Sequence, residues 1–134
     1  MKKQDTLENL ARLAYLAIGS NLGNKIRNIE VAKLEIEKYK IKILKSSSNY
    51  ISESWPDATK PNYINIVIKV KTSLTPIELL KTCNSIELKL GRIRSSINAP
   101  RICDIDIIDY DKRVQNEKNR DWNREKARHF RKSS

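Results

Sequence analysis

The sequence predicts an α+β domain of the ferredoxin-like class, with β-α-β-β-α-β chain order, a four-stranded antiparallel sheet and two helices on one face. Three observations predict this class. Residues 63–71 alternate strictly between apolar and other side chains, which is the period of a half-buried strand. Two segments, after Asn24 and after Thr75, repeat apolar residues at helical spacing behind a capping residue. The length of 134 residues suits one domain with one core.

The first half of the chain supplies two strands and one helix. Residues 14–18 are a short apolar run that Gly-Ser-Asn ends, and they predict the first strand. Residues 42–50 predict a second strand, and residues 51–62, which contain two prolines, predict a loop. Between the two strands, Asn24 caps a helix whose apolar positions are Ile26, Ile29, Ala32, Ile36 and Tyr39.

The second half supplies the remaining two strands and the second helix. On the strand at residues 63–71, the isoleucines share one face and mostly polar side chains share the other. Residues 75–78 (Thr-Pro-Ile-Glu) form a capping box with proline at the first helical position. Gly91 is placed to end this helix, and residues 104–110 predict the last strand. The helix is expected to bury Leu79, Leu80, Cys83, Ile86 and Leu90.

The charge of the chain is concentrated at its C-terminal end. Residues 112–134 hold nine Lys/Arg and three Asp/Glu, so +6 of the formal +11 lies there and +5 is spread over the other 111 residues. This segment has no apolar period and predicts a disordered or weakly helical basic tail. We therefore expect an N-terminal extension at 1–13, one domain at 14–111 and the tail at 112–134, and the charge distribution weakens a nucleic-acid function.

Composition also bears on location and on the cysteines. No run approaches the roughly 18 apolar residues of a membrane helix, and residues 1–13 lack the apolar core of a secretory signal. We therefore expect a cytoplasmic protein. Cys83 and Cys103 form no metal-binding pattern, and no disulfide is expected between them in the cytosol.

Asp104 and Asp106 are candidate metal ligands. They lie two apart on a strand, so both carboxylates project from one face, where they repel each other unless a divalent cation lies between them. Oxygen ligands of this kind suit Mg²⁺ that is also bound to phosphates. The alternative is a solvated edge strand with protective charges, and the two-residue pattern alone favours that alternative.

Three arginines near this pair make a phosphate site plausible. Arg92, Arg94 and Arg101 flank the loop before the acidic strand, and guanidinium groups bind phosphate oxygens in bidentate geometry. Each arginine alone would be interpreted as surface charge. A polyphosphate with Mg²⁺ needs both carboxylates and guanidinium groups, and the sequence brings both kinds together.

The expected topology gathers distant residues at one edge of the sheet. The first strand lies between the third and the fourth and antiparallel to both, so its end at Gly19 lies beside Tyr63 and Asp104. Asn65 shares the face of Tyr63 and can bind the edge of a heterocycle, although a polar pair on an open face explains it equally well. Trp55 either covers a ring or packs its loop against the sheet.

These segments resemble the 6-hydroxymethyl-7,8-dihydropterin pyrophosphokinase family over about residues 14–111. The last two of four matching stretches, in this order and spacing, form a specific signature. The resemblance implies a ferredoxin-like fold and a transferase that moves pyrophosphate from ATP to the hydroxymethyl oxygen of a reduced pterin in folate synthesis, leaving AMP. The four stretches are AYLAIGSNLGN at 14–24, PNYINIVIKV at 61–70, SIELKLGRIR at 85–94 and APRICDIDIIDY at 99–110.

The resemblance also implies roles for single residues. Asp104 and Asp106 would hold two magnesium ions, and Arg92 and Arg101 would be catalytic by stabilising charge on the transferring group. ATP would contact Asn84, Glu87, Arg94, Arg101 and Ile107. The pterin would contact Gly19, Ser52, Glu53, Trp55, Tyr63 and Asn65.

The sequence departs from the family pattern in its last part. The family continues with a Pro-His-Pro segment, an arginine and an aromatic residue that complete both sites, and residues 112–134 do not match it. His129, the only histidine, is expected to be a solvated tail residue. The loop between Arg94 and Arg101 has no tryptophan where the family usually has one. The sequence therefore predicts a C-terminally truncated member with impaired activity.

Two other functions stay open from the sequence. One is a non-catalytic ferredoxin-like binding module whose basic tail contacts nucleic acid, although the open sheet face lacks the aromatic ladder of RNA-binding sheets. The other is an inactive remnant. The leading prediction is a monomeric enzyme that binds ATP and a pterin and binds neither membranes nor nucleic acid.

Overall fold

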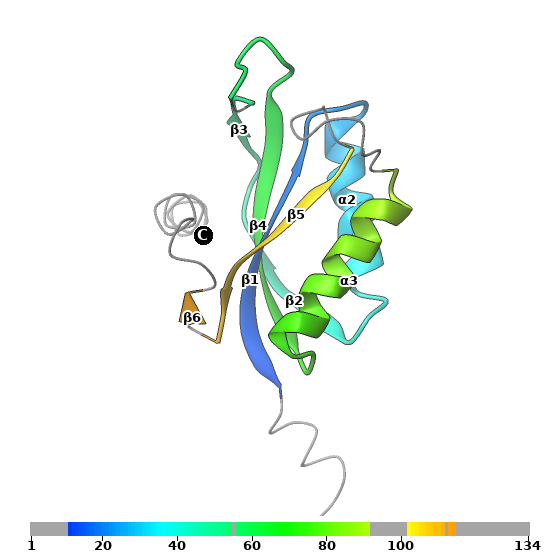
Figure 1. Ribbon diagram of the computed structural model, residues 1–134, viewed down its shortest axis with the longest axis vertical. Coiled ribbons are helices and arrows are strands. Elements are labelled where there is room, and N and C mark those ends of the chain that lie inside the picture. The colour runs from blue at the N-terminus through cyan, green and yellow to red at the C-terminus, as the bar shows by residue number, and fades with distance from the viewer. Residues whose placement is uncertain (1–10, 55, 92–101, 112, 115–134) are drawn as a thin grey trace, which may run out of the picture.

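The fold is a sheet covered on one side by two helices (Figure 1). The computed structural model describes residues 11–54, 56–91, 102–111 and 113–114. In these residues the elements are β1 (Arg12–Ser20), α2 (Lys25–Ile36), β2 (Ile41–Ser46), β3 (Tyr50–Ser52), β4 (Tyr63–Thr72), α3 (Pro76–Lys89), β5 (Asp104–Tyr110) and β6 (Arg113–Val114).

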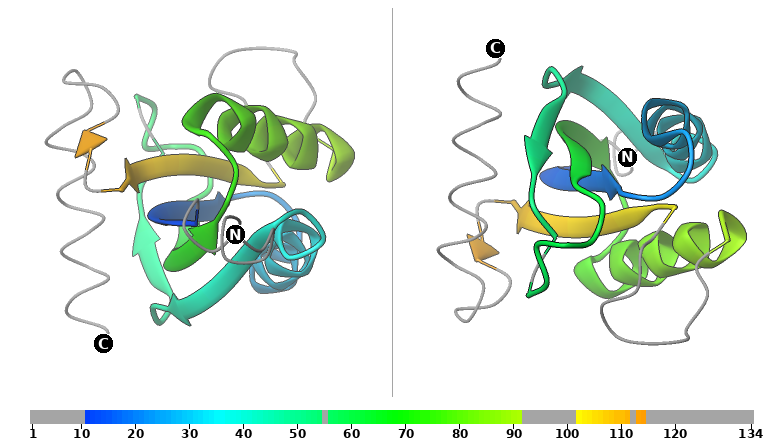
Figure 2. Two further views of the ribbon diagram at one scale, coloured as in Figure 1. Left: turned by 90° about the horizontal axis from the view of Figure 1, so that it is seen from below. Right: turned by 90° about the horizontal axis from the view of Figure 1, so that it is seen from above.

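The sheet has the strand order of the predicted class. Its order is β2-β4-β1-β5-β6, with β3 also paired to β4, and every pairing is antiparallel. Figure 2 shows α2 and α3 side by side on the same face of this sheet. The ferredoxin-like α+β fold is therefore confirmed, with two short strands, β3 and β6, added to the four that the sequence predicts.

The core lies between the sheet and the helices. Alternate residues of β4, among them Ile66, Ile68 and Val70, are buried there, as the alternation of apolar residues predicts. Leu16 and Ile18 of β1 pack beside them. Burial of this apolar face is the main stabilising term, because each buried aliphatic side chain contributes about 1.5–3 kcal/mol.

Both helices begin with the predicted caps. The Asn24 side chain accepts a hydrogen bond from the Arg27 backbone amide at 3.2 Å. Thr75 and Glu78 form the reciprocal capping box, with distances of 3.2 and 2.9 Å. The predicted apolar stripes are partly wrong, because the sheet covers a narrower arc of each helix than the spacing suggests. Ile26 and Leu80 are exposed for this reason, whereas Tyr39 is exposed because α2 ends before it, at Ile36.

The second predicted strand is divided. Residues 42–50 were expected to be continuous, whereas β2 ends at Ser46 and β3 begins at Tyr50 and continues into the predicted loop. The reason is Ser47: its backbone amide donates to the Val67 carbonyl, and its hydroxyl accepts from the Val67 amide, both at 2.8 Å. A side chain thus replaces one rung of the ladder, and the chain bends before pairing resumes.

The sheet also continues past the predicted end of the domain. Arg113–Val114, inside the segment expected to be a polar tail, forms β6 against Asp109 and Tyr110. Asp111 makes the turn with a φ of 51°, a conformation that aspartate tolerates better than most residues. Residues 115–134, including His129, lie outside the described residues, as do residues 1–10.

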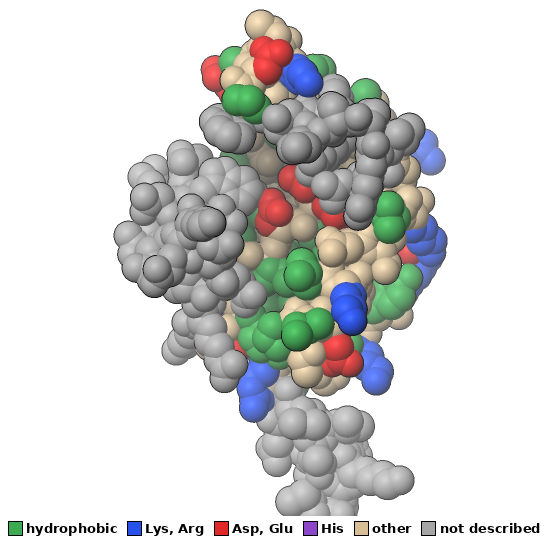
Figure 3. Space-filling view, in the orientation of Figure 1, with side chains coloured by type: hydrophobic (Ala, Val, Ile, Leu, Met, Phe, Trp, Pro, Cys, Tyr) green, Lys and Arg blue, Asp and Glu red, His purple; other side chains and the backbone are tan. Residues whose placement is uncertain are grey.

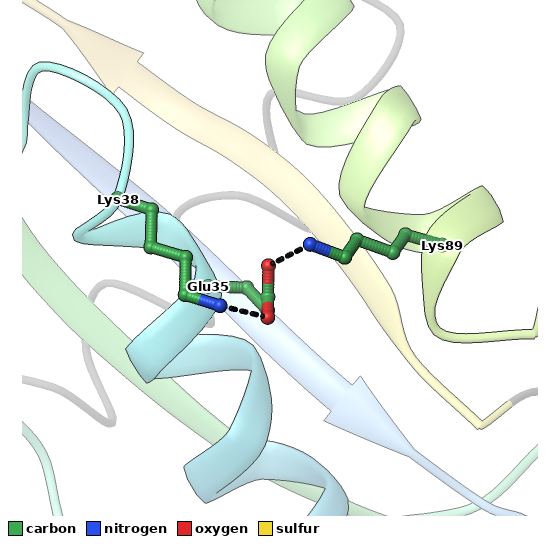
Figure 4. Close-up of polar contacts among 3 residues, drawn as sticks. All are labelled: Glu35, Lys38 and Lys89. Atoms are coloured by element: carbon green, nitrogen blue, oxygen red, sulfur yellow. Dashed lines mark hydrogen bonds and ion pairs between the residues drawn. The ribbon is translucent and has the colours of Figure 1, made fainter.

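A buried carboxylate connects the two helices (Figure 4). Glu35, near the end of α2, accepts hydrogen bonds from Lys38 at 2.7 Å and from Lys89 at 2.9 Å. Lys89 lies in the last turn of α3, so the contact joins the C-terminal ends of both helices. The two lysine ammonium groups hold the pKa of Glu35 below its ordinary value of 4.5.

Both cysteines are free and buried, and Cys83 lies on the buried stripe of α3. Burial raises the pKa of Cys83 to about 12, and the carboxylates of Glu87 and Asp106 add to the effect. Burial likewise raises the pKa of Cys103, so both thiols stay protonated and unreactive at neutral pH. No helix among the described residues is long and apolar enough to cross a membrane.

Replacing Glu35 with Gln is expected to lower the melting temperature at neutral pH. The folded-state pKa of Glu35 is lowered, so its ion pairs stabilise the fold above pH 4.5 and this contribution is lost as the pH falls through the folded-state pKa. The difference in melting temperature between the wild type and Glu35→Gln should therefore shrink between about pH 5 and pH 3 in calorimetry. A difference that stays constant over this range would contradict the assignment.

Candidate active site

The strand register brings three distant segments to one edge of the sheet. Gly19, near the end of β1, pairs with Asn65 of β4 on one side and with Asp104 of β5 on the other. Residues directly opposite in antiparallel strands share a face, so Asn65 and Asp104 project from the same side. Two strand spacings separate them, which is about 10 Å. The predicted convergence of these strand ends is therefore confirmed.

This face is the one that the helices leave open. Ile18 and Ile105, which alternate with Gly19 and Asp104, lie in the helix-facing core. Asp106 is paired with Ala17, which belongs to a separate small cluster on the open face. Both aspartates of β5 therefore project away from the helix-covered core, as the metal-site prediction requires.

Gly19 allows its neighbours to approach closely. A Cβ atom at this position would lie 2.7 Å from Asn65 Oδ1 and 3.1 Å from Tyr63 Cδ1. The Asn65 amide nitrogen donates to Ser52 Oγ at 2.8 Å and to the Tyr50 carbonyl at 3.4 Å. These bonds turn the amide oxygen of Asn65 over Gly19, toward β5. Tyr63, Asn65 and Ser52 therefore form one polar group on β3 and β4.

A second polar network, which no sequence motif indicated, holds the loop between β3 and β4 beside this group. The Asn21 amide donates to Ser54 Oγ at 3.1 Å and to the Pro61 carbonyl at 3.3 Å, and the Ser54 hydroxyl donates to the same carbonyl at 2.5 Å. Asn21 and Ser54 are buried. The density of asparagines in residues 20–28 was the available signal, since Asn28 also binds Ser20 Oγ at 3.1 Å.

The acidic pair projects from the open face of β5. Asp104 and Asp106 are both half-buried on β5, and acidic side chains gather over this strand in Figure 3. Within the described residues no group of three or more His, Cys, Asp or Glu side chains could hold a metal ion. Mg²⁺ is commonly held by one or two carboxylates together with phosphates and water, so the pair fits that ion.

Three residues predicted to contact the nucleotide, Asn84, Glu87 and Ile107, differ in their burial and in their contacts. Glu87 is 2% exposed on α3, and its Oε2 accepts a hydrogen bond from the Ile105 backbone amide at 2.8 Å. Asn84 is exposed one turn earlier on the same helix. Ile107 packs against the helix-facing core, on the opposite face from the two aspartates. Of these three residues, Ile107 belongs to the strand that carries the acidic pair, and Glu87 is bonded to that strand.

Several predicted residues lie elsewhere. Glu53 is exposed next to Ser52, at the start of the loop. An open depression of about 560 Å³ lies at the other end of the sheet, where Lys42, Lys71 and Thr72 line it. It is therefore separate from the Gly19 end. Four predicted residues lie outside the described residues: Trp55, Arg92, Arg94 and Arg101.

Comparison with known proteins decides the family. The model of the 7,8-dihydro-6-hydroxymethylpterin-pyrophosphokinase family matches residues 15–127. The chain belongs to this family. The matched range includes Gly19, Asn65 and Asp104 of the candidate site and continues past residue 111, where the expected resemblance ends.

Individual relatives agree with the family. A 2-amino-4-hydroxy-6-hydroxymethyldihydropteridine pyrophosphokinase of Aquifex aeolicus is 40% identical over 96 residues, which are 72% of this chain and 59% of the relative. The protein of the same name from Methylorubrum extorquens is 35% identical over 99 residues, 73% of this chain and 63% of the relative. The folic acid synthesis protein fol1 of Schizosaccharomyces pombe is 36% identical over 112 residues, 83% of this chain but 15% of the relative. The chain thus spans less than two thirds of the length of each of these relatives.

A double-mutant cycle tests the close approach at Gly19. Gly19→Ala is expected to destabilise the fold by about 1–3 kcal/mol, because the new methyl group overlaps the Asn65 amide oxygen. Asn65→Ala removes that oxygen, so the double variant should lose less stability than the sum of the two single variants. Free energies of unfolding from urea titration measure the cycle. Additive losses would show that the two residues do not touch.

Proposed function

We propose that this chain transfers pyrophosphate from ATP to the hydroxymethyl oxygen of 6-hydroxymethyl-7,8-dihydropterin, a step of folate synthesis that leaves AMP. The observation that carries the proposal is the pairing of Gly19 with both Asn65 and Asp104. This pairing places the polar group of Tyr63, Asn65 and Ser52 on β3 and β4 beside the two carboxylates on β5. Family membership and the names of the relatives support the same reaction.

The proposed nucleotide side is built on β5. Asp104 and Asp106 would hold Mg²⁺, which would neutralise charge on the ATP phosphates and orient them. The residues fit this ion because both are oxygen ligands on one face, half-buried, next to the small residues Gly19 and Ala17. Arg92, Arg94 and Arg101 are proposed to bind the phosphates, and Asn84 and the segment at Ile107 to contact the nucleotide.

The proposed pterin side is built on β3 and β4. The Asn65 amide oxygen, directed over Gly19, can accept a hydrogen bond from a ring N–H, while its nitrogen is held by Ser52. Tyr63 offers an aromatic face beside it. Trp55 and Glu53 are proposed to cover the ring from the loop after β3. A hydrogen bond between Asn21 and Ser54 holds this loop in place.

In this proposal the chain acts mainly by positioning. The sheet holds the pterin-binding residues and the acidic pair about two strand spacings apart, so substrates bound to the two groups would lie next to each other between them. Fixed charges around the phosphates then stabilise the charge that develops during transfer. We also propose that the protein works as a monomer in the cytoplasm, which size-exclusion chromatography with light scattering and cell fractionation would test.

The activity is tested by mixing the purified protein with ATP, Mg²⁺ and the pterin and measuring AMP. We expect Mg²⁺-dependent AMP formation, and Asp104→Asn with Asp106→Asn should reduce the rate by roughly 100-fold or more, because metal coordination contributes several kcal/mol. Asp111→Asn, on the same chain but beyond β5, is the matched control and should leave the rate unchanged. Absence of pterin-dependent AMP formation by the wild type would refute the proposal.

A nucleic-acid-binding module is the second candidate, and one observation bears on it. On the open face Lys42 lies directly opposite Lys71, and Lys45 lies opposite Lys69. Such like-charged pairs destabilise a sheet by themselves. However, β2 is the outermost strand of the described sheet order, and lysines on edge strands also prevent sheets from pairing between molecules.

We expect these lysines to act as edge protection. Filter binding with single-stranded RNA should therefore give only the weak, non-specific dissociation constant of about 10⁻⁴–10⁻⁶ M at physiological salt. Binding much tighter than this, steeply salt-dependent and lost in Lys42→Ala with Lys45→Ala, would favour the binding module instead.

A further inference from the structure

A buried carboxylate supports the strand that carries the acidic pair. Glu87 is 2% exposed, and it lies between α3 and the start of β5. Its Oε2 accepts a hydrogen bond from the backbone amide of Ile105 at 2.8 Å. A charged group out of water is costly unless specific bonds compensate for the lost hydration, so this contact constrains where the side chain can lie.

The hydrogen bond from the Ile105 amide to Glu87 lies on the outer edge of β5, where no described strand pairs with this part of β5. One edge of β5 pairs with β1, while its other edge pairs with β6 only at Asp109 and Tyr110. In the described part of the chain, the first half of β5 has no strand on that outer edge. A backbone amide there still needs an acceptor, and Glu87 supplies it for Ile105.

Ile105 is the residue between the two aspartates. Its side chain is buried in the helix-facing core, and its amide is held by Glu87, so both its side chain and its backbone are fixed. Asp104 and Asp106 flank Ile105. The contacts that fix Ile105, from Glu87 and from the helix-facing core, therefore also restrict the positions of the two carboxylates. Mg²⁺ requires near-octahedral geometry at about 2.0–2.1 Å, so a small displacement of either carboxylate would weaken binding.

We infer that Glu87 is a positioning residue for the acidic pair, acting through the Ile105 backbone, and that it does not contact the nucleotide itself. This inference rests on the proposed function and replaces the nucleotide-binding role that the family resemblance implies for Glu87. A side chain with 2% of its surface exposed and one oxygen bonded to β5 presents almost nothing to a ligand.

Two conservative variants separate the two roles. Glu87→Gln loses the charge but keeps an acceptor oxygen at the same reach, whereas Glu87→Asp keeps the charge but withdraws the oxygen by one methylene. If Glu87 acts by positioning, Mg²⁺ affinity should be nearly unchanged in Glu87→Gln and about 10–100-fold weaker in Glu87→Asp. If it contacts the bound Mg²⁺-nucleotide directly, the order is reversed, and that result would overturn the inference.

The measurement is a Mg²⁺ titration by calorimetry in the presence of a non-hydrolysable ATP analogue. Glu35→Gln is the matched control: it also removes a buried helix carboxylate, but one bonded to lysines, so it should lower stability without changing Mg²⁺ affinity. No Mg²⁺-dependent nucleotide binding by the wild type would refute the proposed function. Equal affinities in the wild type and Glu87→Asp would refute the positioning role alone.

Amide exchange gives a readout without metal. The Ile105 amide should be protected from hydrogen exchange in the wild type and in Glu87→Gln, and its protection should fall in Glu87→Asp by a larger factor than that of the Ile68 amide in the centre of the sheet. An Ile105 amide that exchanges at an unprotected rate in the wild type would overturn the inference, because Glu87 would then not hold it.

Discussion

The pairing of β1 with a strand on each of its edges is the constraint on which the proposed site depends. Gly19 has Asn65 on one side and Asp104 on the other, so β1 joins these two residues. Because side chains alternate with a period of two, a slip of one residue in either ladder would turn a polar residue into the core. The apolar face of β1 prevents such a slip, since Leu16 and Ile18 are fully buried. The core thus sets the register, and the register builds the site.

Two buried carboxylates, Glu35 and Glu87, connect the two helices to each other and to the sheet. Glu35 joins α2 to Lys89 near the end of α3, and Glu87 joins α3 to the start of β5. The chain of contacts therefore runs from one helix to the other and then to the strand of the acidic pair. Both lysine side chains bonded to Glu35 are more than half exposed, so these ion pairs each contribute only modest stability. Of these two carboxylates, Glu87 is the one bonded to the strand of the acidic pair, whereas Glu35 bonds to lysines of the helix layer.

The open face divides into two chemical regions. Asn65, Tyr63 and the aspartates lie toward the Gly19 end, while the lysines of β2 and β4 lie toward the other end. A small apolar cluster of Ala17, Val67 and Ile108 separates them. Ile108 shares this face with Asp104 and Asp106 because side chains alternate along the strand. The register of β1 and β5 shifts just beyond it, between Tyr15 and Leu16, so that Asp109 pairs with Tyr15. The irregularity lies beyond Asp106, so the pairing of the acidic residues is undisturbed.

The sequence by itself determined the fold class, the helix caps and the boundaries of β5, because these follow from local periodicity and from side chains that bond to nearby backbone. It also predicted that Gly19, Asn65 and Asp104 meet, since chain order limits the possible topologies. Only the tertiary structure decided the roles of Asn21, Ser47, Ser54 and Glu87. Each of them bonds to a partner distant in sequence or across a strand, through geometry that no local pattern encodes. The exposure of Ile26 and Leu80 was likewise decided by how much of each helix the sheet can cover.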